Sequence, residues 1–66
     1  MKIIVNGETK EFQENISIAK LLSELSLEGK VMAAAVNMNI VKQDSWSEYI
    51  LSDGDKLELL DFVGGG

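Results

Sequence analysis

The stretch Ser17–Ser26, SIAKLLSELS, decides the fold, because its apolar residues recur with the periodicity of an amphipathic helix. The spacing is i, i+3, i+4 and i+7, and the residues that follow it are Ile18, Leu21, Leu22 and Leu25. Ser17 is a suitable N-cap, and Gly29 lies just beyond the stretch and helps to end the helix. One helix with a single apolar stripe predicts that a sheet lies against that stripe.

The residues before the helix predict a β-hairpin. Met1–Asn6 is short and rich in β-branched side chains, as strands are. Asn6-Gly7 is the pair that type I′ hairpin turns favour, because both turn positions need a positive φ. Glu8–Gln13 is then the returning strand.

The residues after the helix predict further strands. The apolar run Val31–Val36 has the length of a buried strand, although Ala33-Ala34-Ala35 is ambiguous on propensity alone. The later segments are interpreted as a turn at Asn37–Asn39, a short strand at Ile40-Val41, an irregular stretch with one helical turn around Ser45-Trp46, a turn at Ser52–Asp55 and a last strand at Lys56–Val63.

This order of elements predicts an α+β domain with a mixed sheet packed on one helix. A compact arrangement places the first and last strands side by side in the middle of the sheet. We expect one domain over residues 1–63 and a flexible C-terminal tail over residues 64–66.

The composition excludes several classes of function. The chain has 66 residues, no histidine and no cysteine, so disulfides, zinc–thiolate sites and histidine proton transfer are excluded. All six basic residues are scattered lysines and the net charge is −5, which disfavours nucleic-acid binding. The acidity serves either solubility or attraction to a basic partner. Without a secretory or membrane-spanning segment, the expected location is the cytoplasm, and we expect a monomer.

Three glycines, Gly64, Gly65 and Gly66, end the chain directly after the last strand. An unstructured terminus or a leftover linker has the same composition. The functional alternative is a narrow arm that threads a partner's channel and presents the Gly66 carboxylate there. From Val63 to Gly66 such an arm reaches about 13 Å at ~3.3 Å per residue.

Alternation along the last strand predicts a docking surface. Leu57 and Leu59 fall on the face toward the helix, and Leu60 and Phe62 fall on the opposite face. With Ile4 of the neighbouring first strand, Leu60 and Phe62 are expected to form an exposed apolar patch. The alternative is that the loop 42–49 covers this patch.

Two other motifs favour structural roles. Asp53-Gly54-Asp55 lacks the further oxygen ligands of a calcium loop and is interpreted as a tight turn, with no metal site. Trp46, the single tryptophan, is interpreted as a packing residue, and a hot spot for a partner is the alternative.

Taken together, these elements and motifs resemble the ThiS family of sulfur carrier proteins, which have the ubiquitin-like β-grasp fold (ββαββ). The resemblance covers nearly the whole chain and rests on Val5-Asn6-Gly7-Glu8, Leu21-Leu22, Ala35-Val36-Asn37, Ile40-Val41, Trp46, Asp53-Gly54-Asp55 and Val63-Gly64-Gly65-Gly66. One departure is Lys42-Gln43, where the family often has Pro-Arg, and a lysine cannot reproduce the bidentate geometry of arginine.

The resemblance implies a carrier and not an enzyme. An E1-like adenylyltransferase of the ThiF type would activate the Gly66 carboxylate with ATP. Sulfur from a cysteine desulfurase route would then give a thiocarboxylate, and a thiazole synthase of the ThiG type would receive it for thiamine biosynthesis. No cofactor is expected to be tightly bound. Two alternatives remain open, a molybdopterin-synthase carrier subunit and a ubiquitin-like binding module whose tail is never activated.

Overall fold

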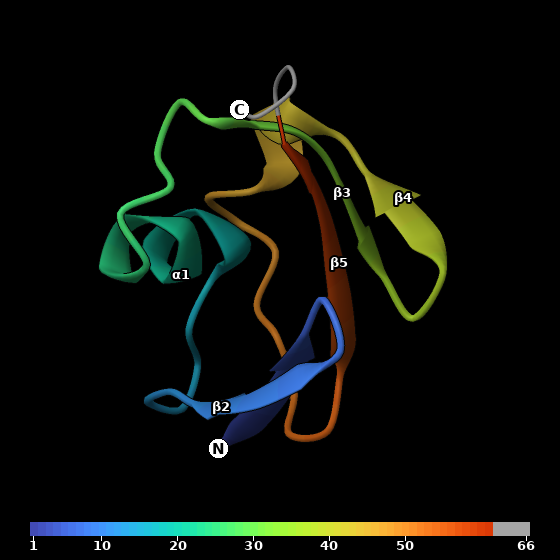
Figure 1. Cartoon of the computed structure of the whole chain (residues 1–66). Helices are drawn as coiled ribbons and strands as arrows, with labels where there is room; N and C mark the ends of the chain where they lie inside the picture. Colours follow the sequence, from blue (N-terminus) through green and yellow to red (C-terminus); the bar gives the residue numbers. More distant parts are fainter. Residues whose placement is uncertain (62–66) are drawn as a thin grey trace.

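The computed structural model describes residues 1–61, and its elements follow the predicted order (Figure 1). They are β1 (Lys2–Val5), β2 (Glu8–Glu11), α1 (Ile18–Glu24), β3 (Val31–Val36), β4 (Asn39–Val41), the 3-10 turn η1 (Gln43–Ser45) and β5 (Lys56–Asp61). The predicted continuation of the last strand through Val63 and the tail 64–66 lie outside the described residues.

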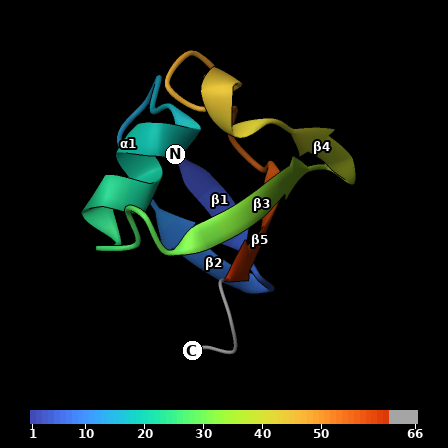
Figure 2. The same cartoon turned by 90° about the horizontal axis from the view of Figure 1, so that it is seen from above.

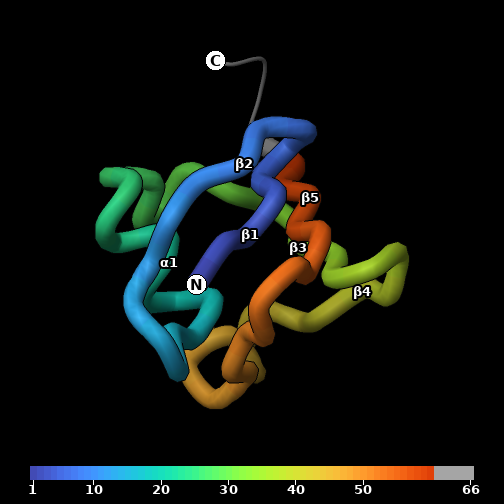
Figure 3. The backbone as a smooth tube through the Cα atoms, turned by 90° about the horizontal axis from the view of Figure 1, so that it is seen from below, coloured from blue at the N-terminus to red at the C-terminus, as the bar shows by residue number. Residues whose placement is uncertain are grey.

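The five strands form one mixed sheet in the order β2-β1-β5-β3-β4. β1 and β5 are adjacent in the middle, as predicted; they pair in parallel, and the other neighbouring strands are antiparallel. Figure 2 shows α1 on one face of the sheet, and Figure 3 shows β1 alongside β5 from below. This is the expected ubiquitin-like β-grasp arrangement.

The helix begins and ends with capping hydrogen bonds. Ser17 is the N-cap, as predicted, and its hydroxyl accepts from the backbone N–H of Lys20 at 3.1 Å. At the other end Ser26 adopts a φ of 60°. The N–H of Leu27 donates to the carbonyl of Leu22 at 2.8 Å, the pattern of a Schellman motif. The left-handed residue that ends the helix is therefore Ser26 and not the predicted Gly29.

The core lies between α1 and the inner face of the sheet. Its largest fully buried side chains are Ile3, Ile16, Ile18, Leu21, Leu57 and Val36. Trp46 closes one end of this core, since it is 8% exposed and its Nε1 donates to the carbonyl of Val41 at 2.7 Å. Its predicted packing role is confirmed.

A β-bulge in β3 changes the alternation of that strand. Val31 pairs with Asp61 and Ala33 pairs with Leu60, so Met32 is the additional residue. Because of this shift, Val31 and Val36 are both buried although they are separated by an odd number of positions. Ala33 and Ala35 are left on the outer face.

The acidic turn 53–55 holds the start of β5 against β1. Asp53 Oδ1 accepts from the N–H of Lys2 at 2.7 Å, Asp55 Oδ2 accepts from the N–H of Ser52 at 2.8 Å, and Gly54 has a φ of 87°. Both carboxylates thus serve the turn, as predicted. Within residues 1–61 no group of three or more acidic, histidine or cysteine side chains is placed to hold a metal.

Candidate functional site

The predicted reactive end of the chain follows β5 directly. Phe62, Gly64, Gly65 and Gly66 lie outside the described residues. The structure does show that Asp61 ends a strand in the centre of the sheet, paired with Val31 of β3. Any chemistry at Gly66 therefore takes place within about 17 Å of the end of a central strand, the extended length of five residues at ~3.3–3.6 Å each.

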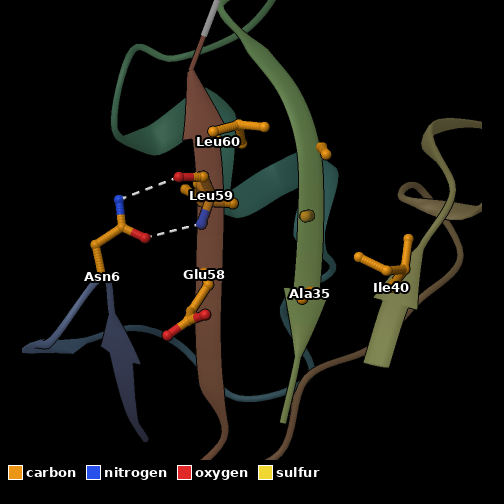
Figure 4. Close-up of a pocket in the computed structure, with 8 residues that line it drawn as sticks. Asn6, Ala35, Ile40, Glu58, Leu59 and Leu60 are labelled. Carbon is orange, nitrogen blue, oxygen red and sulfur yellow. Dashed lines mark hydrogen bonds between the residues drawn. The ribbon is translucent and has the colours of Figure 1, made fainter. Parts of the chain in front are cut away.

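The outer face of the sheet carries a shallow groove of about 340 Å³ (Figure 4). Its floor is formed by Ala33 and Ala35 of β3, and Leu60 of β5 and Ile40 of β4 stand on either side. Leu60 is 59% exposed and Ile40 is 72% exposed. Leu60 thus lies on an exposed apolar surface, as predicted from alternation.

Strand register explains why the groove is hollow. Ala33 pairs with Leu60, and Ala35 pairs with Ile40, so a small side chain sits beside a large one on both sides of β3. Glu58 and Asn6 add polar groups at the edge of β5. The groove therefore has apolar walls, a floor close to the β3 backbone and a single carboxylate among the described residues that line it.

The prediction that Ile4 of β1 lies beside Leu60 in one apolar patch is wrong. β1 and β5 pair in a register that places Ile4 beside Lys56. Ile4 is half-buried and lies four positions, roughly 13 Å, from the level of Leu60 along the strands. Ile4 and Leu60 therefore do not share one patch, and the apolar neighbours of Leu60 come from β3 and β4 instead. A docking role for each residue stays a prediction.

The loop 42–49 packs away from the groove. None of its residues lines the groove, Trp46 points into the core, and Gln43 Nε2 donates to the carbonyl of Val31 at 3.3 Å. Lys42 is exposed. At the position of the family's Pro-Arg, one side chain thus supports the start of β3 and the other faces solvent.

Sequence reasoning missed a second role of Asn6, which it interpreted only as a turn residue. Its side-chain amide binds both polar main-chain groups of Leu59 (Figure 4). An asparagine directly before the hairpin glycine was the available signal, since asparagine combines positive φ with a side chain that hydrogen-bonds main chain.

The family model described as the ThiS family matches residues 3–66. The chain belongs to the ThiS family. It is 29% identical over 66 residues to the sulfur carrier protein ThiS of Escherichia coli (strain K12), with all of both chains covered. A crystal structure of the thiamine biosynthesis protein ThiS from Geobacter metallireducens superposes with a TM-score of 0.82 at 28% identity, again over the whole of both chains.

A longer relative is also similar. The thiazole synthase of Paramagnetospirillum magneticum (strain ATCC 700264 / AMB-1) is 38% identical over 66 residues. This chain is covered completely by the match and spans only 20% of that relative's length. A ThiS-like region thus exists within a protein named as a thiazole synthase.

The structure adds one finding on membranes. Across the part of the chain that the structure describes, no helix is both long enough and apolar enough to span a bilayer.

Proposed function

We propose that this chain is a sulfur carrier of thiamine biosynthesis whose working group is the carboxylate of Gly66. The observation that carries the proposal is the family match over residues 3–66, which includes the three terminal glycines. The fold supports it, because the tail follows a central strand that is held on both sides. Glycines allow the terminal backbone to approach another protein's active site closely.

The proposed chemistry begins with activation of the carboxylate, which is a poor electrophile. A Gly66 carboxylate oxygen attacks the α-phosphorus of ATP in an E1-like enzyme of the ThiF type, and pyrophosphate leaves. A persulfide formed by a cysteine desulfurase then attacks the acyl carbon through its terminal sulfur, and AMP leaves. A second thiol of the donor protein reduces the resulting acyl disulfide, which leaves a disulfide on the donor and a thiocarboxylate at Gly66. The thiocarboxylate then donates its sulfur for formation of the thiazole ring.

The chain acts in this scheme as a protein co-substrate and not as an enzyme. It has no histidine or cysteine to supply proton transfer or a thiolate, so the partners must contribute the catalytic groups. A thiazole synthase of the ThiG type is the proposed sulfur acceptor. The thiazole synthase that contains a ThiS-like region supports this class of partner. ATP is consumed by the activating enzyme and is not a bound cofactor of the carrier.

The outer groove is the proposed docking surface for these partners. Exposed Leu60 and Ile40 present apolar area that a partner can bury. The small alanine side chains between them leave room for a side chain of the partner. Phe62, next on the same face by alternation, extends this surface in the proposal, and Ile4 does not adjoin it.

The test is the C-terminal chemistry itself. Incubated with ATP, a sulfur source and a ThiF-type enzyme, the chain should form an acyl-adenylate and then gain the mass that replacement of one oxygen by sulfur produces. Deletion of Gly65-Gly66, or addition of one residue after Gly66, should abolish ATP–pyrophosphate exchange. Exchange that continues unchanged in either variant would refute the proposal. A parent chain that shows no exchange would also refute it and would favour a binding module whose tail is never activated.

The molybdopterin-synthase carrier is the second candidate, and acceptor specificity separates the two. The thiocarboxylated chain should deliver sulfur to a ThiG-type synthase and not to the catalytic subunit of molybdopterin synthase. Family membership favours the thiazole route.

A further inference from the structure

Asn6 holds β5 close to the point where the tail begins. Its Oδ1 accepts from the N–H of Leu59 at 2.8 Å, and its Nδ2 donates to the carbonyl of Leu59 at 3.4 Å. Residues 6 and 59 are 53 positions apart, so these bonds join the first hairpin to the last strand. Leu59 precedes the end of β5 by two residues.

The Asn6 side chain takes the place of one further peptide unit of β1. The parallel ladder runs from Ile4 N–H to the carbonyl of Asp55, and from Asn6 N–H to the carbonyl of Leu57, both at 2.9 Å. The next step of a parallel ladder would bind Leu59 through main-chain groups of β1. At Asn6 the φ of 49° turns the main chain into the hairpin, and the side-chain amide supplies the missing acceptor and donor.

Asn37 makes a corresponding contact at the opposite end of β5. It also has a positive φ, 50°, and is also the first residue of a two-residue hairpin turn, here between β3 and β4. Its N–H donates to the carbonyl of Lys56 at 2.8 Å, and its Oδ1 accepts from the N–H of Lys56 at 3.0 Å. Two asparagines thus bind the two ends of one strand, and only Asn6 is near the tail.

We infer that Asn6 is a positioning residue for the reaction at Gly66, an inference that rests on the proposed function. Among the described residues, Asn6 is the last partner of β5 on the β1 side, and only β3 pairs with β5 beyond it. The Asn6 amide and β3 therefore hold the end of β5 from its two sides. Because the acyl carbon of Gly66 lies five residues further along the chain, the position of this strand end sets the point from which a docked partner must reach it.

Misplacement of a reacting atom by about 1 Å can cost ~100-fold in rate. Loss of the Asn6 amide should therefore lower the rate constant of tail activation. Asn6 also lines the edge of the groove, so a role in docking would instead raise the KM for the carrier.

The experiment compares Asn6→Gly with Asn37→Gly in the full chain. Glycine accepts a positive φ, so each substitution removes the side-chain bonds and leaves the turn conformation available. ATP–pyrophosphate exchange with a ThiF-type enzyme gives kcat and KM for each carrier. We expect Asn6→Gly to lower kcat at least ~10-fold with KM within about two-fold of the parent, and Asn37→Gly to leave both unchanged.

Amide hydrogen exchange supplies a readout that does not depend on the partner. The Leu59 amide should exchange faster in Asn6→Gly, whereas the Lys56 amide should do so in Asn37→Gly. Asn6→Asp keeps the acceptor for the Leu59 N–H and tolerates positive φ, so its kcat should lie between those of the parent and Asn6→Gly. If Asn6→Gly does not fold, Asn6→Asp is compared with Asn37→Gly, since an aspartate at position 37 would lie against Asp55, whose Oδ1 accepts from Asn37 Nδ2 at 3.0 Å.

Several results would overturn the inference. Equal kcat for Asn6→Gly and Asn37→Gly shows that the Asn6 bonds serve stability alone. A change confined to KM makes Asn6 a docking residue. Both results require an active parent chain, so they differ from failure of the proposed function, in which the parent itself shows no exchange and this inference falls with it.

Discussion

The two faces of the central sheet use the same strands for different purposes. On the inner face, Leu57 and Leu59 of β5 are 0% and 8% exposed and pack under α1. On the outer face of the same strand, Leu60 is 59% exposed beside alanines. Since neighbouring residues of one strand differ this much, burial here follows from side-chain direction and not from hydrophobicity.

Because of this difference, side chains on the inner face contribute to the free energy of folding, and side chains on the outer face contribute to the free energy of binding. An inner side chain contributes to folding because its removal leaves a cavity that the structure cannot refill. An outer side chain contributes only when a partner covers it, because water already contacts it in the free protein. Substitutions on the two faces should therefore be separable by measuring unfolding and binding on the same variants.

The largest effect on stability is expected on the inner side, at Leu22 of α1. This residue is 3% exposed, and Leu22→Ala should lower the free energy of unfolding by about 2–5 kcal/mol. For a domain of this size that is most of the stability, which is only ~3–5 kcal/mol. Urea unfolding followed by circular dichroism gives the value. A loss below about 1 kcal/mol would contradict the assignment of Leu22 to a tightly packed core.

Local patterns predicted the inner face well. The helical stripe and the alternation of Leu57 and Leu59 are properties of single segments, and each needs only a period of 3.6 or 2. Asn6-Gly7 predicted its hairpin because the turn requires positive φ at both positions, which the structure has at 49° and 88°. The central position of the terminal strands followed from the order of elements.

The outer face was predicted less completely because it depends on registers between distant segments. Nothing local to Ile4 determines that it pairs with Lys56, a residue 52 positions later, and the predicted patch was misplaced for that reason. The bulge at Met32 is likewise an adjustment of β3 to β5. Alternation counted from the buried Val31 would place Ala33 and Ala35 on the inner face, whereas the bulge leaves them on the outer face, on the floor of the groove.

The next largest effect separates docking from folding on the outer face. Leu60→Ala should leave the free energy of unfolding within about 1 kcal/mol of the parent, because its side chain is mostly in water. The same substitution should weaken binding to the ThiF-type enzyme by roughly five-fold or more. Calorimetry and urea unfolding on one preparation test both statements.

Met32→Ala is the matched control for Leu60→Ala. Met32 is an apolar residue of the same sheet with 48% exposure, and it does not line the groove. Its substitution should change neither binding nor unfolding by a comparable amount. If Leu60→Ala binds as tightly as Met32→Ala, the groove is not the docking surface, and recognition falls to the tail.

The smallest expected effect concerns ionic strength, and it should act on association with the partner and not on folding. The chain carries a net charge of −5, and in the described residues no charged side chain is buried in the core. Raising salt from 0.1 M to 1 M shortens the Debye length from about 10 Å to about 3 Å, which weakens attraction to a basic partner. Association with the ThiF-type enzyme should therefore slow several-fold, while the dissociation rate changes little. The free energy of unfolding should stay within about 1 kcal/mol of its value at low salt, since exposed charges contribute little individually.

Stopped-flow association at the two salt concentrations measures the effect. An association rate that does not depend on salt would mean that the acidity serves solubility and that apolar contact in the groove guides the encounter alone.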